Sequence, residues 1–182
     1  MTRRCPVVVI ASREQQLESV ASAVASEVAR ECGAPHLPVR IGSARRDVPT
    51  PREDALWFLG WDAGRENSLT IVESSLAALA DATPVPSHVA LFAIHPQGGP
   101  SSASSGVPSW DPGRVRVIAP VESFASTSEG VERSEQLHRA RQWAARVYAD
   151  WHSNSRTNDP GSPGLGAPPE GPKSVPWCGM MD

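Results

Sequence analysis

Runs of apolar residues alternate along the chain with segments of helical periodicity. Three runs, VVVIA at 7–11, ALWFLG at 55–60 and VALFAI at 89–94, are nearly continuous, as is typical of strands covered on both faces. Two weaker runs complete a set of five predicted strands. The five are Pro6–Ala11, Leu37–Ile41, Ala55–Gly60, His88–Ile94 and Arg114–Ala119.

The segments between these runs predict three helices. In residues 13–32, apolar side chains recur at i, i+3, i+4, i+7 and i+11 from Leu17, so they share one helix face. Ser12 and Gln15 have the spacing of a capping box that opens this helix, and Gly33 is placed to end it. The other two predicted helices are residues 69–80 and 131–151.

Strands that alternate with helices predict an α/β domain with a parallel sheet and helices on both faces. We place this domain at residues 1–152, with a long loop at 97–111. Residues 153–175 are rich in Pro, Gly, Ser and Asn and bury too little apolar surface to fold, so they predict a disordered linker. The linker leads to a C-terminal peptide, residues 176–182, which ends in WCGMMD.

The charge and the cysteines narrow the class of protein. A net charge of −3 argues against a nucleic-acid partner, which usually requires a basic excess. Three cysteines without CxxC spacing (Cys5, Cys32 and Cys178) argue against a disulfide scaffold and suit a reducing compartment. The N-terminal apolar run is too short for a signal peptide or a membrane span. We therefore expect a soluble cytoplasmic protein.

The first and last segments of the domain resemble the flavodoxin-like family. VVVIASREQQLESVASAVASEVA is similar to that family's first strand, phosphate loop and first helix. VRVIAPVESFASTSEGVERSEQLHRARQWAARV is similar to its last strand and last helix. The resemblance covers roughly residues 4–152 and implies a three-layer α/β/α fold with five parallel strands. It also implies that FMN binds at the carboxyl edge of the sheet, with its phosphate at the N-terminus of the first helix.

The phosphate loop departs from the family pattern, which is roughly Ser/Thr-x-Thr-Gly-Asn-Thr. Ser12 matches the first position and Arg13 follows it, but Glu14, Gln15 and Gln16 replace Thr, Gly and Asn. A carboxylate about 4 Å from a phosphate charge costs about 4 kcal/mol at an effective dielectric constant near 20. A nanomolar ligand has only about 12 kcal/mol of binding free energy in total. The loop is therefore either a repurposed phosphate site or a helix start without a ligand.

The loops after the third and fourth strands hold the residues that the resemblance places near a flavin ring. Trp61 stands where the family often stacks an aromatic side chain, although the same side chain would also cover the sheet edge. Paired glycines after the fourth strand would let backbone amides approach a flavin, or they make a plain turn. The candidate cofactor contacts are Ser12, Arg13, Gln15, Gln16, Trp61, Asp62, His95, Gln97, Gly98 and Gly99.

Two other features are candidates for chemistry. His95 is the one histidine expected at this edge, where it could donate a proton or simply end a strand. No histidine spacing indicates a metal site, but Cys178, Met180 and Met181 are soft ligands of the kind that suit Cu(I). The same terminal cluster also suits a docking peptide on a flexible tether, or has no specific role.

Two hypotheses of function remain open at this point. One is an FMN-binding electron-transfer or small reductase protein with a redox partner, in which the flavin supplies the redox chemistry. The other is a flavodoxin-like domain that has lost its flavin and acts as an accessory or binding module, recruited through its C-terminal peptide.

Overall fold

The computed structural model of the chain describes residues 6–42, 55–82, 87–96, 108–126 and 130–157. Strands and helices alternate through most of these residues, as the apolar pattern predicts. In chain order the elements are β1 (Val7–Ile10), α1 (Gln15–Cys32), β2 (Val39–Ile41), β3 (Leu56–Asp62), α2 (Glu66–Ala82), β4 (Ser87–Pro96), β5 (Val115–Val117), β6 (Glu122–Ser126) and α3 (Val131–Thr157).

The strands form one parallel sheet in the order β2-β1-β3-β4-β5, with β6 also paired to β4. This order confirms the predicted α/β class. It is the strand order of flavodoxin-like doubly wound sheets, with which the flanking helices are also compatible. In such sheets the ligand crevice lies at the carboxyl ends of the strands, near the point where the order reverses between β1 and β3.

The fifth position of the sheet is divided between two short strands. β5 pairs with Ser87–Val89 at the start of β4, and β6 pairs with Phe92–Pro96 at its end. Pro120 lies between them and has no N–H to continue the hydrogen-bond ladder. β5 covers Val115–Val117, so the predicted strand Arg114–Ala119 is too long at both ends. The sequence did not predict β6, because Phe124 is the one buried residue of this strand.

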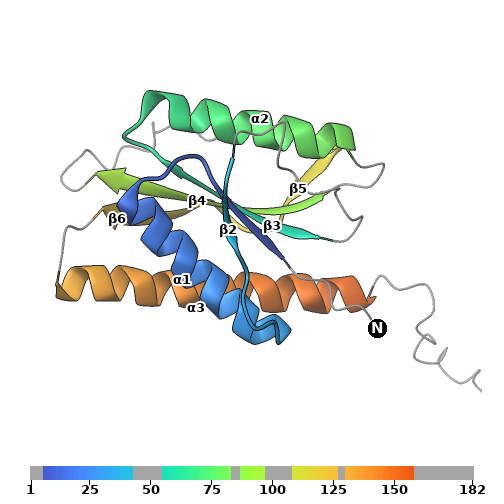
Figure 1. The fold of residues 1–182 in the computed structure, drawn as a ribbon. Coiled ribbons are helices and arrows are strands. Elements are labelled where there is room, and N and C mark those ends of the chain that lie inside the picture. The colour runs from blue at the N-terminus through green and yellow to red at the C-terminus, as the bar shows by residue number, and fades with distance from the viewer. Residues whose placement is uncertain (1–5, 43–54, 83–86, 97–107, 127–129, 158–182) are drawn as a thin grey trace, which may run out of the picture.

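The helices cover both faces of the sheet and make three layers. α1 and α3 lie on one face and α2 lies on the other (Figure 1). Successive side chains of a strand point to opposite faces, so Leu56 and Phe58 pack towards α1 and α3, whereas Trp57 and Leu59 pack towards α2. The near-continuous apolar runs are thus explained by burial on both sides.

An aromatic cluster holds α3 against the sheet. The ring of Trp143 lies edge-on to the rings of Phe58, Phe92 and Phe124, with centroids 5.6, 5.9 and 6.2 Å away. Edge-to-face pairs of this kind add to the free energy gained by burial alone. Gly60 makes room for the cluster, because a Cβ atom at this position would lie 2.2 Å from Cζ of Phe92.

The α2 face has a core of its own, in which Trp57 and Trp61 are each 2% exposed. The indole N–H of Trp57 is buried, and no group in residues 6–42, 55–82, 87–96, 108–126 or 130–157 accepts a hydrogen bond from it. Trp110 packs against the margin of this core.

The structure confirms the predicted C-terminal cap of α1 but not the predicted N-terminal cap. Gly33 ends the helix as predicted, with φ of 68° and a pair of backbone hydrogen bonds, Gly33 N–H to Arg30 O and Ala34 N–H to Ala29 O. The predicted capping box is wrong, because the N-cap residue is Glu14 and its side chain makes no capping hydrogen bond. Ser12 lies two residues before that cap, too far to act as the capping side chain.

α3 continues to Thr157, beyond the predicted end at residue 151. The apolar side chains that recur at helical spacing in this segment, Leu137, Ala140, Ala144, Val147 and Trp151, end with Trp151. The residues after it are polar, so periodicity could not find the last turns. The helix therefore includes residues 153–157, which the sequence assigned to the linker. The rest of the linker and the terminal peptide, residues 158–182, lie outside the described residues.

Candidate functional site

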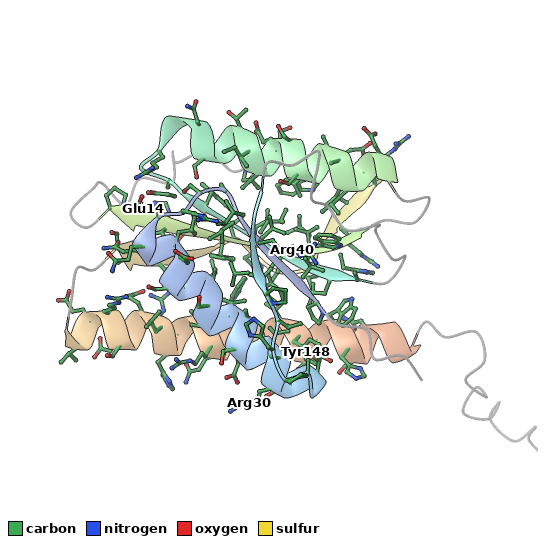
Figure 2. The ribbon with its side chains drawn as sticks, in the orientation of Figure 1. Glu14, Arg30, Arg40 and Tyr148 are labelled. Carbon is green, nitrogen blue, oxygen red and sulfur yellow. The ribbon has the colours of Figure 1, made fainter. Side chains whose placement is uncertain are left out.

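The candidate site is the carboxyl edge of the sheet, where the loops after β1 and β3 meet the N-terminus of α1. Figure 2 shows Glu14 at this end of α1, on the same side of the molecule as the carboxyl end of β4. The backbone ties these segments together, since Ala11 N–H donates to Gly60 O (2.9 Å) and Ala63 N–H donates to Ile94 O (2.8 Å).

Glu14 is paired with an arginine from the neighbouring loop. Its Oε2 accepts a hydrogen bond from Nη2 of Arg65, just before α2. Nε of the same guanidinium lies 3.7 Å from Oδ2 of Asp62. The side chains are 35% exposed for Glu14, 57% for Arg65 and 17% for Asp62. We call these three residues the ion-pair cluster, and it links the loop after β1 to the loop after β3.

Hydrogen bonds fix Asp62 within this cluster. Its Oδ1 accepts the backbone N–H of Gly64 at 2.8 Å, and its own N–H donates to Oγ of Ser68 at 3.0 Å. The carboxylate of Asp62 thus stabilises the turn that leads from β3 into α2, and its ion pair with Arg65 keeps that guanidinium close to Glu14.

The candidate phosphate-binding residues have different surroundings. Oγ of Ser12 is buried and has no hydrogen-bond partner among the described residues. Arg13 and Gln15 are exposed. The Ser126 hydroxyl donates to Oε1 of Gln16, which joins the first turn of α1 to the end of β6. The charges of Arg13, Glu14, Asp62 and Arg65 sum to zero, so these residues do not form a basic pocket for a phosphate.

Of the residues expected near a flavin ring, the structure describes three, Trp61, Asp62 and His95. Trp61 is 2% exposed and lies in the α2-side core, opposite Ala93 of β4. Asp62 belongs to the ion-pair cluster, and His95 lies two strands away from β1. Gln97, Gly98 and Gly99 lie outside the described residues, as do the candidate metal ligands Cys178, Met180 and Met181.

His95 is hydrogen-bonded to a serine that the sequence did not indicate. Its Nε2 lies 3.2 Å from Oγ of Ser123 on the neighbouring strand β6. A serine hydroxyl beside an imidazole has the composition of a nucleophile and a general base. Nucleophilic catalysis by such a pair also needs a group that orients the imidazole and hydrogen-bond donors for an oxyanion. The neighbouring acid, Glu122, is bound to Arg139 at 2.7 Å. The pair was missed because β6 itself was missed.

Further polar contacts join α1 to α3 near the same edge. Nη2 of Arg133 donates to Oγ of Ser19 at 2.8 Å, and that hydroxyl donates to the backbone oxygen of Gln15 at 2.8 Å. At this edge, hydrogen bonds and ion pairs thus join α1 to α3, to β6 and to the loop after β3.

Within the described residues, no group of three or more His, Cys, Asp and Glu side chains is arranged to hold a metal ion.

A scan against protein-family models found no match to the chain, and searches of curated proteins and of solved structures found none either. The likeness to the flavodoxin-like fold thus rests on strand order and layers alone. Among the helices of the described residues, none has the length and apolar character needed to cross a membrane.

Proposed function

We propose that this chain is a flavodoxin-like domain that has lost flavin binding and acts as an accessory or binding module. The observation that carries the proposal is the ion-pair cluster of Glu14, Arg65 and Asp62. It occupies the loops after β1 and β3, between which the switch point of the sheet lies.

The cluster opposes a phosphate in two ways. A phosphate at the N-terminus of α1 would meet the carboxylate of Glu14, and two unit charges about 4 Å apart repel by about 4 kcal/mol at an effective dielectric constant near 20. Partial exposure of Glu14 lowers this value by solvent screening. To use Arg65 instead, the phosphate would have to displace the carboxylates that already neutralise it.

The burial of Trp61 supports the same conclusion. A ring that stacks on isoalloxazine must present a face at the ligand edge, whereas this ring is 2% exposed and belongs to the buried core on the α2 side of the sheet. Exposing it would remove a large apolar surface from the core, which is unfavourable.

The direct test is titration of the purified full chain with FMN, followed by flavin absorption, flavin fluorescence quenching and calorimetry. We expect no saturable change at micromolar concentrations of protein and FMN. Saturable binding with one flavin per chain would overturn the proposal.

A pair of variants tests whether Glu14 is the cause. Glu14→Thr removes the carboxylate and restores a hydroxyl at the family's position. The matched control is Glu18→Thr, which removes an exposed carboxylate from the first turn of the same helix. We expect Glu14→Thr to bind FMN at least about tenfold more tightly than the control, since each tenfold change is about 1.4 kcal/mol. Equal affinities would mean that another feature excludes the flavin.

The second candidate function is an FMN-binding electron-transfer protein or small reductase. One observation favours it: the hydroxyl of Ser12 is buried beside the start of α1 and has no partner in the part of the chain that the structure describes, as expected of a group that awaits a ligand. The titration described above decides between the two candidates.

The partner of an accessory module would be recruited through the C-terminal peptide. Because α3 ends at Thr157, a chain ending there is the correct comparison for the full chain. We expect affinity capture with the full chain to retain a protein that the shortened chain does not. Identical retained proteins would remove the peptide from the proposal.

A further inference from the structure

Strand β6 lies at an edge of the described sheet. It pairs with β4 on one side, and no described strand pairs with its other side. A strand in this position presents a row of backbone N–H and C=O groups that can pair with another chain. How these groups are satisfied decides whether the edge is open to association.

Two side chains of α3 bind the outward backbone groups of β6. The N–H of Ala125 donates to Oε1 of Gln136 at 3.4 Å, and Nη2 of Arg139 donates to the carbonyl oxygen of Ser123 at 3.2 Å. An N–H that donates to Gln136 is not donating to β4. Because Ser123 and Ala125 are two residues apart, their backbone groups point to the same side of the strand, which is the unpaired side.

Arg139 is held in place by three further contacts. Nη2 lies 2.7 Å from Oε1 of Glu122, Nη1 donates to Oε1 of Gln136 at 3.4 Å, and the guanidinium carbon lies 5.5 Å from the ring centroid of Phe124. A guanidinium above an aromatic face is attracted by the ring quadrupole. Phe124 is fully buried, so it gives the guanidinium a rigid base. Arg139 therefore binds three consecutive residues of β6.

We propose that Gln136 and Arg139 close the β6 edge against a further strand, and that the strand they exclude is β6 of a second copy of this chain. A two-fold axis beside the edge would place two copies of β6 antiparallel, so each would offer the same donors and acceptors to the other. The side chains of Ser123 and Ala125 point to a face of the sheet and not along its edge, so among the described residues Gln136 and Arg139 are the side chains that bind these outward backbone groups.

The test compares self-association of the wild-type chain with that of a Gln136→Ala, Arg139→Ala double variant by sedimentation velocity over a range of concentrations. We expect the double variant to self-associate at least about tenfold more tightly than wild type. The matched control is Arg141→Ala with Gln142→Ala, which removes the same two residue types from exposed positions of the same helix. Neither side chain makes a hydrogen bond to β6 within the described residues, and Gln142 is bonded to His138 instead.

Two additional variants keep the proposal open to refutation. Ser123→Pro, added to the double variant, removes an outward N–H and is tolerated on an edge strand, so it should restore the wild-type sedimentation profile. Gln136→Ala alone keeps every contact of Arg139 with Glu122 and Phe124, and should shift association in the same direction if the double variant does not fold. Folded variants that sediment like wild type, or association that survives Ser123→Pro, would overturn the proposal.

Discussion

Gly60 shows how one residue sets the packing of a whole face. It lies in the middle of the sheet, between β1 and β4, and the ring of Phe92 covers it on the α1 and α3 side. Phe92 is fully buried and is held edge-on by Trp143 and Phe124, so the ring has no room to move aside. A side chain at residue 60 would therefore have to displace the aromatic cluster.

We accordingly expect Gly60→Ala to lower the free energy of unfolding by about 1–3 kcal/mol, the usual cost of overpacking a core. Urea unfolding followed by circular dichroism measures this. Gly113→Ala is the control, because its Cβ would meet only the exposed side chain of Asp111, at 3.2 Å. If the clash is the cause, the cost of Gly60→Ala should shrink in a Phe92→Leu background, whereas additive effects would exclude it.

At the same scale, the sequence indicated that Glu14 was out of place in a phosphate loop but not what the side chain would do. Its partner, Arg65, is 51 positions away and belongs to a different loop. Such a pairing depends on the arrangement of β1 beside β3, which no local pattern encodes. The burial of Trp61 on the α2 face was hidden for a similar reason, because its position after an apolar run does not reveal the face to which its side chain points.

Among the elements, α3 connects most of the features described above. Its apolar stripe gives Trp143 to the aromatic cluster, and its polar residues Gln136 and Arg139 reach the edge of β6. The stripe was readable from the sequence because it has a period of 3.6 residues. The edge contacts were not readable, since they involve the polar face of the helix and a strand with a single buried residue.

The end of α3 gives a prediction about stability. A chain that ends at Thr157 should unfold at the same urea concentration as the full chain, whereas one that ends at Asp150 should lose about 3 kcal/mol, as expected when a buried tryptophan is removed. Trp151 is 5% exposed, and its ring centroid lies 5.8 Å from that of Tyr148. Equal stability of the two shortened chains would show that Trp151 adds nothing to the core.

For the whole molecule, the alternation of apolar runs and helical segments was enough to predict a parallel sheet with helices on both faces. The strand order 2-1-3-4-5 agrees with the resemblance found in the first and last segments. The split fifth position was not predicted, because β6 has a single buried residue and because its pairing with a separate part of β4 is not encoded in any local pattern. The two cores also differ: α1 and α3 pack together on one face, whereas α2 is the one helix on the other in the described part of the chain.

The unpartnered indole N–H of Trp57 gives the molecule an internal reporter for that second face. Because no group in the described part of the chain accepts a hydrogen bond from it, this proton should resonate upfield of hydrogen-bonded indole protons. Because it is buried under α2, it should exchange with deuterated solvent only when α2 leaves the sheet. The exchange rate of this proton, followed by nuclear magnetic resonance, would therefore report how often α2 separates from the sheet. We expect Leu79→Ala in α2 to speed this exchange more than Val147→Ala in α3 does. Equal acceleration by both variants would mean that the two layers open together.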